Sequence, residues 1–167
     1  MFVLGIDPGL TRCGFGLVEG SLEGDGRAVA LRAGLIETDP DNPVEGRLAQ
    51  LGRDLARLYR EVTPDVVVVE RVFYQRNART AIPVAQASGV AIALADGAHV
   101  RQFTAQEVKL AVTGYGAADK TQVQAMVARL LGLSEAPRPP DVADALALAL
   151  TFLAVARRES HLPAPAP

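Results

Sequence analysis

The sequence of 167 residues contains no tryptophan, two histidines and a single cysteine. Because Cys13 has no second cysteine to pair with, an internal disulfide is excluded, and we expect a reduced, cytoplasmic setting. His99 and His161 lack the spacing of a zinc site, and Cys13 has no plausible partner for nucleophilic thiol catalysis. Any metal chemistry must therefore use oxygen ligands.

Long hydrophobic segments are also missing. The longest apolar segment, Ala145–Ala156, is shorter than the ~20 residues that a membrane-spanning helix needs. The apolar N-terminus has no basic region before it and is interrupted by Asp7, which argues against a signal peptide. With 49% hydrophobic residues, the chain is expected to be soluble and to form one domain over residues 1–158, followed by a disordered Pro/Ala tail at 159–167.

Lysine is scarce, and basic charge is unevenly distributed. The net charge is −2, but residues 1–70 carry 7 arginines against 12 acids, whereas residues 71–140 carry 6 arginines and 2 lysines against 4 acids. Such a chain can offer a basic surface to a polyanion while remaining acidic in total. The alternative is that these arginines form an ordinary solvated surface.

The pattern of apolar residues predicts an α/β fold with a mixed five-stranded sheet flanked by helices. Three sequential strands with short connections predict an antiparallel meander. The continuous apolar run that follows a helix predicts a buried strand, parallel to the first strand and beside it. The expected strands are 1–7, 13–19, 28–37, 65–70 and 99–103.

The expected helices are 44–62, 78–95, 105–113, 118–131 and 141–158. Thr104 and Glu107 have the spacing of a capping box at the start of the third of these helices. The helix over 78–95 has few charges, so part of it is expected to pack against a second subunit.

Acidic residues follow two of the expected strands and open the last helix. Asp7 and Glu70 end neighbouring parallel strands, so both are expected at the edge where open α/β sheets place their sites. Asp141 and Asp144 are three residues apart and therefore share one face of a helix. Taken singly, each acid is better explained as a turn residue or as a helix cap worth ~1 kcal/mol. The case for function is that all four can reach the same edge of the sheet.

Carboxylates without histidine or cysteine neighbours favour hard cations such as Mg²⁺ or Mn²⁺. Two such ions about 4 Å apart can activate water and stabilise the leaving oxygen of a phosphodiester. Lys120 is a candidate for a positive charge at the same phosphate, although a solvated lysine at a helix start is the simpler interpretation.

In four stretches the sequence resembles the RuvC family of bacterial Holliday-junction resolvases, in order and over nearly the whole chain. These stretches are Gly5–Gly9; Val69–Glu70 with Phe73 and Asn77; Val108–Lys109 with Gly114–Val123; and Asp141–Ala147. The third and fourth stretches are the most specific.

The resemblance implies a ribonuclease-H-like fold, a homodimer, and Mg²⁺-dependent paired nicking of four-way DNA junctions in recombination and repair. It implies two Mg²⁺ per subunit, which Mn²⁺ can replace, and a partnership with the RuvA–RuvB branch-migration complex. The metal-binding catalytic acids would be Asp7, Glu70, Asp141 and Asp144. Lys120 would assist catalysis, and the DNA contacts would be Phe73, Tyr74, Arg76, Asn77, Lys109 and Lys120.

The sequence departs from the family pattern between Thr80 and Gly89. There the family usually has a basic residue near Pro83, a glycine at Ala85 and an arginine at Ser88. The departures affect the helix, the dimer contact and some DNA contacts, but none of the acids.

Three alternatives have different requirements. An actin-like kinase needs a second phosphate-binding hairpin and roughly twice the length. A catalytically inactive nucleic-acid binder would not need all four acids. A nuclease of the same fold that acts on structured RNA is the alternative that sequence discriminates least.

Overall fold

The computed structural model describes residues 1–23, 26–71 and 78–160. Its centre is a five-stranded sheet in the order β3-β2-β1-β4-β5. β1 is antiparallel to β2, β2 is antiparallel to β3, and β4 runs parallel to both β1 and β5. The predicted mixed sheet, a meander followed by parallel strands, is therefore confirmed. The strands are β1 (Phe2–Asp7), β2 (Arg12–Gly20), β3 (Ala28–Glu37), β4 (Val66–Glu70) and β5 (His99–Phe103).

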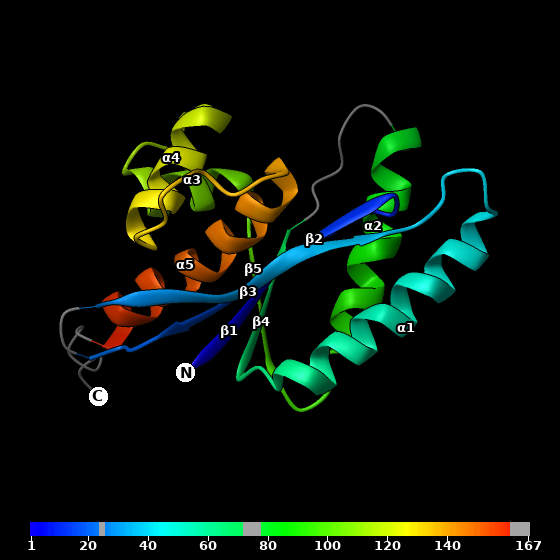
Figure 1. Cartoon of the computed structure of the whole chain (residues 1–167), viewed down its shortest axis with the longest axis horizontal. Helices are drawn as coiled ribbons and strands as arrows, with labels where there is room; N and C mark the ends of the chain where they lie inside the picture. The colour runs from blue at the N-terminus through cyan, green and yellow to red at the C-terminus, as the bar shows by residue number, and fades with distance from the viewer. Residues whose placement is uncertain (24–25, 72–77, 161–167) are drawn as a thin grey trace, which may run out of the picture.

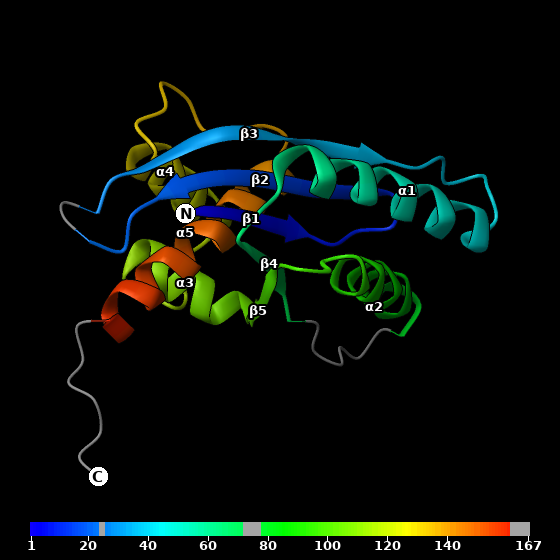
Figure 2. The ribbon, with the colours of Figure 1, turned by 90° about the horizontal axis from the view of Figure 1, so that it is seen from below.

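Helices cover both faces of this sheet, and Figures 1 and 2 show the resulting three layers. The helices are α1 (Val44–Val62), α2 (Ala78–Ala93), α3 (Ala105–Thr113), α4 (Lys120–Leu130) and α5 (Pro140–Ser160). On one face, Leu4 and Ile6 pack with α1 and α2; on the other, Val3 and Val68 pack with α3, α4 and α5. Because β1 and β4 are covered on both faces, their sequences are nearly continuous apolar runs.

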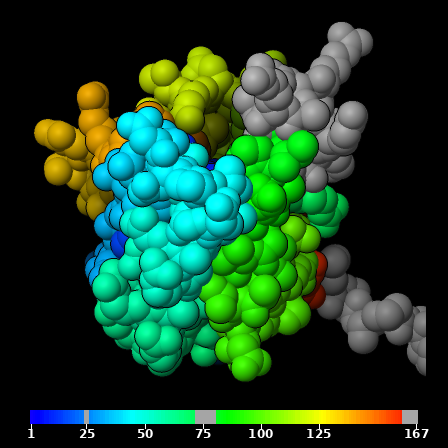
Figure 3. Space-filling model, turned by 90° about the vertical axis from the view of Figure 1, so that its right-hand side faces the viewer, coloured from blue at the N-terminus to red at the C-terminus, as the bar shows by residue number. Residues whose placement is uncertain are grey.

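α1 and α2 lie side by side and form much of one side of the molecule (Figure 3). The α2 helix ends at Ala93, before the expected end at Ala95, because the N–H of Ala95 bonds the carbonyl three residues back and Gly97 turns the chain with a φ of 82°. The α5 helix extends through Ser160, beyond the expected end at residue 158. Glu159 pairs with Arg101 of β5 at 3.5 Å, which supports this last turn.

The approach of α5 to the sheet requires glycine. A Cβ atom at Gly5 of β1 would overlap the carbonyl oxygen of Ala145, and one at Gly14 of β2 would overlap that of Asp141. These two glycines let the helix backbone lie directly on the strands. The N-terminus of α5 therefore lies against the end of β1. Among the described residues, no helix is both long and apolar enough to cross a membrane.

Candidate active site

The first two candidate acids end neighbouring parallel strands. Ile6 of β1 lies opposite Val69 of β4 in the parallel register, so Asp7 and Glu70 follow at the same edge of the sheet. Burial is the main cause that raises the pKa of Asp7 to about 7, and the carboxylates of Asp144, Glu70 and Asp141 raise it further. Burial and Asp144 also raise the pKa of Glu70. The four acids therefore share one electrostatic environment.

The turn after β1 is supported by a polar cluster formed with Arg47 of α1 and Thr38, which directly follows β3. The guanidinium of Arg47 donates to Thr11 Oγ1 at 2.6 Å and to Thr38 Oγ1 at 3.0 Å. The buried Thr38 hydroxyl in turn donates to the carbonyl of Leu10 at 2.5 Å. These bonds fix the loop that directly follows Asp7.

Both acids of α5 are held by cationic side chains. Lys120 Nζ lies 2.8 Å from Asp144 Oδ2, and Arg12 Nη2 lies 2.5 Å from Asp141 Oδ2. The bond to Asp144 raises the pKa of Lys120. Burial acts to raise the pKa of Asp141, but the hydrogen bond from Arg12 and the charges of Arg12 and Lys120 outweigh it, and the pKa is lowered.

Lys120 is placed by the cap of its helix. Asp119 accepts from the backbone N–H of Gln122 at 2.8 Å, and the Gln122 side chain accepts from the Asp119 N–H at 2.9 Å. This capping box makes Lys120 the first residue of α4 and directs the helix start toward α5. The capping box expected at Thr104 and Glu107 is present at the start of α3.

A cavity of about 240 Å³ adjoins the acids. Two acids and two lysines line it, over an apolar floor. Its lining residues are Glu70, Ala105, Val108, Lys109, Lys120, Val123, Asp144 and Leu148. The cavity therefore brings both lysines of the chain next to Glu70 and Asp144.

The carboxylate set fits divalent cations in charge and in donor type. Burial and the three other carboxylates raise the pKa of Asp7, and a cation bound there would offset both effects. Among the described residues, no three acid, histidine or cysteine side chains lie close enough to hold a metal as they stand. Asp141 and Asp144 instead pair with the cationic side chains of Arg12 and Lys120.

Cys13, the one cysteine of the chain, lies on β2. Cys13 is buried, and burial raises the pKa of its thiol to about 12, so the thiolate is not formed near neutral pH.

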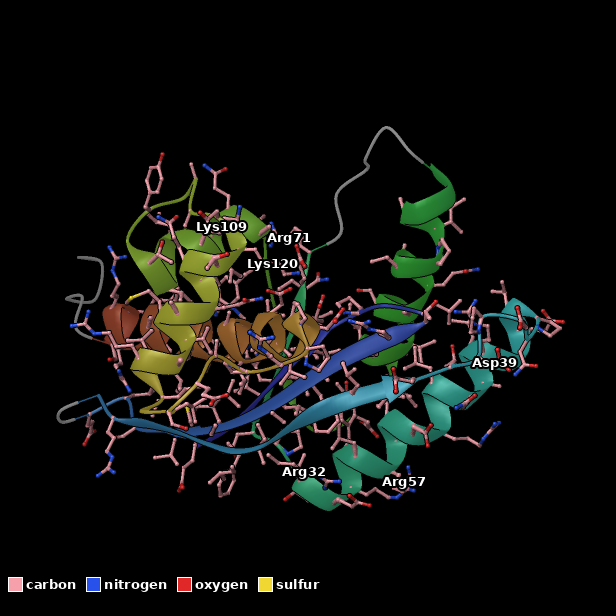
Figure 4. The ribbon with its side chains drawn as sticks, turned by 45° about the horizontal axis from the view of Figure 1, so that its top comes forward. Arg32, Asp39, Arg57, Arg71, Lys109 and Lys120 are labelled. Carbon is pink, nitrogen blue, oxygen red and sulfur yellow. The ribbon has the colours of Figure 1, made fainter. Side chains whose placement is uncertain are left out.

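Four of the candidate DNA contacts, Phe73, Tyr74, Arg76 and Asn77, lie outside the described residues. The adjoining Arg71 is exposed, and Figure 4 shows it in the same region as Lys109 and Lys120, away from Arg32 and Arg57. Sequence reasoning missed two basic residues near the acids, Arg12 and Arg71. The sequence could have indicated Arg71, because it directly follows the candidate acid Glu70. It could not have indicated Arg12, because its partner Asp141 is 129 positions away.

Comparison with known proteins identifies the family. A family model described as "Crossover junction endodeoxyribonuclease RuvC" matches residues 3–152. The chain belongs to the RuvC family. The RuvC proteins of Salinispora arenicola and Leifsonia xyli are 56% and 54% identical to it, over 90% and 89% of this chain and 86% and 71% of their own lengths.

Solved RuvC structures share its fold. The structure of Thermus thermophilus RuvC superposes with a TM-score of 0.86 at 37% identity, covering 95% of this chain and 97% of that one. A second T. thermophilus RuvC structure, in complex with a Holliday junction substrate, gives a TM-score of 0.84 at 35% identity, covering 95% and 96%. The yeast mitochondrial resolvase Ydc2, at 16% identity and a TM-score of 0.68, shares the fold. The predicted ribonuclease-H-like α/β fold and the RuvC resemblance are both confirmed.

Proposed function

We propose that this chain is a structure-selective DNA endonuclease that resolves Holliday junctions by paired, metal-dependent phosphodiester hydrolysis during recombination and repair. The observation that carries the proposal is the convergence of four acids from three elements, β1, β4 and α5, on one edge of the sheet. Membership of the RuvC family and the fold shared with a junction-bound relative support the choice of substrate.

Asp7, Glu70, Asp141 and Asp144 are the proposed metal ligands and catalytic acids. Two Mg²⁺ ions per subunit, or Mn²⁺ in their place, would supply an activated water and stabilise the leaving oxygen. Asp7 is the proposed shared ligand, because after burial the carboxylates of all three other acids contribute to its raised pKa. Lys120, at 2.8 Å from Asp144, is positioned to reach a phosphate held at the acids.

Lys109 extends the positive charge along the cavity, and Arg71 adds to it from the end of β4. We assign the backbone phosphates to these side chains, since phosphate contacts position a nucleic acid without reading its sequence. Phe73 is the proposed base-stacking residue at the junction centre, with Tyr74, Arg76 and Asn77 as further DNA contacts. Aromatic side chains stack on unpaired bases whatever their identity.

A homodimer completes the proposal. A junction has two equivalent strands to cut, and a two-fold pair of subunits places one site at each. The charge-poor α2 supports this, because Ile82 on its surface is 57% exposed. Cooperation with the RuvA–RuvB branch-migration complex follows from the family and is proposed on that basis alone.

A nicking assay tests the function. The protein is incubated with a synthetic four-way DNA junction, labelled on each strand in turn, in Mg²⁺, Mn²⁺ or EDTA. We expect nicks at symmetric positions on two opposite strands with either metal and none in EDTA. A linear duplex and a four-way RNA junction of the same sequence serve as controls. Equal cleavage of the RNA junction would favour the RNA nuclease, and binding without cleavage would favour the inactive binder.

A further inference from the structure

Arg12 is the first residue of β2, and its ion pair with Asp141 of α5 lies at the exposed rim of the acid cluster. The Arg12 side chain is 45% exposed and that of Asp141 is 26% exposed. In the sheet register, Arg12 lies opposite Glu37 of β3. Its guanidinium is therefore held from one side by the site and faces solvent on the other.

Stability does not explain this pair. The contact between α5 and β2 is already made by close backbone approach at Gly14 and by the buried side chains of Leu146 and Leu153. A half-exposed ion pair adds little to such packing. The location of Arg12, bound to a proposed metal ligand, indicates a role in the site itself.

Metal binding and the Arg12 pair compete for the same carboxylate. Arg12 Nη2 occupies Asp141 Oδ2 at 2.5 Å, so a divalent cation that recruits this carboxylate weakens or replaces the bond. A guanidinium cannot lose its charge in a protein. Once released, Arg12 remains a fixed positive charge at the rim, where Glu37 of β3 is its remaining acidic neighbour. On a bound junction, the DNA backbone phosphates compete with Glu37 for this charge.

We propose that Arg12 is a positioning residue that holds Asp141 in the metal-free protein and transfers to a DNA backbone phosphate when a divalent cation binds the acids. Metal loading thereby creates a DNA contact at the rim of the site. The inference rests on the proposed function, because it assumes that the acids hold metal and that DNA crosses this edge.

The test is the metal dependence of one DNA contact. Junction affinity is measured by fluorescence anisotropy for wild type and Arg12→Gln at several salt concentrations, in EDTA and in Ca²⁺, which also takes carboxylate oxygens. A denaturing gel checks that the junction stays intact. In EDTA the two proteins should bind equally. In Ca²⁺ the variant should bind several-fold more weakly, and its slope of log affinity against log salt should be smaller by about 0.9, the effect of one phosphate contact.

Three further variants isolate the mechanism. Arg32→Gln removes the same charge from a pair with Glu61, on β3 and α1, and should match wild type under both conditions. Arg12→Lys should retain most of the Ca²⁺-dependent contact. Asp141→Asn removes the carboxylate that holds Arg12, so in this background Arg12→Gln should weaken binding even in EDTA.

An Arg12→Gln effect of equal size in EDTA and Ca²⁺, or no effect in either, would overturn the inference. Thermal melts establish that each variant is folded. If Arg12→Gln does not fold, wild type is compared with Asp141→Asn in EDTA. The inference predicts a steeper salt dependence of junction affinity for Asp141→Asn, because Arg12 is free in that variant to contact a phosphate. Cleavage by wild type in Mg²⁺ reports separately on the proposed function, whatever the outcome for Arg12.

Discussion

Asp7 is predicted to destabilise the metal-free protein above neutral pH. Burial and the neighbouring carboxylates raise its pKa from 3.8 to about 7 in the folded state. A shift of this size corresponds to about 4 kcal/mol between the two protonation states. Because the folded-state pKa is the higher one, the stabilising effect of the bound proton is complete below about pH 4 and is lost as pH rises to about 7.

Asp7→Asn removes this titration. In EDTA we expect the variant to be similar to wild type near pH 4 and more stable by up to about 4 kcal/mol at pH 8. For a chain of this length, that difference corresponds to a rise in Tm of roughly 8–16 °C. The same variant should bind the junction and lose cleavage in Mg²⁺, because the amide keeps the shape of the side chain but is a weaker metal ligand.

The assay is urea unfolding followed by circular dichroism at pH 4.5, 6 and 8, in EDTA and in Mg²⁺. Mg²⁺ should stabilise wild type at pH 8 and have little effect on Asp7→Asn. Asp54→Asn, which removes a carboxylate of α1 that pairs with Arg57 away from the site, is the matched control and should keep the wild-type pH dependence. If Asp7→Asn is less stable than wild type at pH 8, the ionised Asp7 carboxylate does not destabilise the metal-free protein, and the prediction is wrong.

Further substitutions test the site and its supports. Lys120→Gln should lower single-turnover cleavage about 100-fold, the loss typical of one electrostatic contact in a transition state, with a small effect on affinity; a proportional loss of binding would contradict this role. Gly5→Ala should lower the free energy of unfolding by about 3 kcal/mol or more in urea melts, because the added methyl overlaps the Ala145 carbonyl; a neutral effect would show that α5 can move away. Arg47→Met should slow cleavage while leaving junction affinity unchanged, since it frees the loop after Asp7; unchanged rates would contradict that support. Phe73→Ala should impair junction cleavage more than duplex binding, and equal effects would argue against a place at the junction centre.

Local patterns explain why much of the site could be predicted. Asp7 and Glu70 each end an apolar run, and the helix between those runs requires a parallel crossover, so their meeting follows from topology. Asp141 and Asp144 share a face because helical spacing dictates it. The capping box at Thr104 is also a local signal, and the structure has it.

Long-range contacts explain what could not be predicted. Nothing near Arg12 in the sequence points to Asp141, and the role of Arg47 depends on Thr11 and Thr38, which lie in connections distant from it along the chain. The sequence offered Lys120 as a solvated lysine or a phosphate contact, but it did not predict the ion pair with Asp144. The pairing of acids with cations arises from three-dimensional packing, which patterns of apolar residues do not encode.

Diffraction from crystals with Mn²⁺ and a junction tests the metal site most directly. Anomalous scattering should place two Mn²⁺ ions about 4 Å apart, both within reach of Asp7 and each bound by a further acid from β4 or α5. Manganese peaks away from these four carboxylates, or none at the edge where β1 and β4 end, would contradict the assignment of the acids as the metal-binding site.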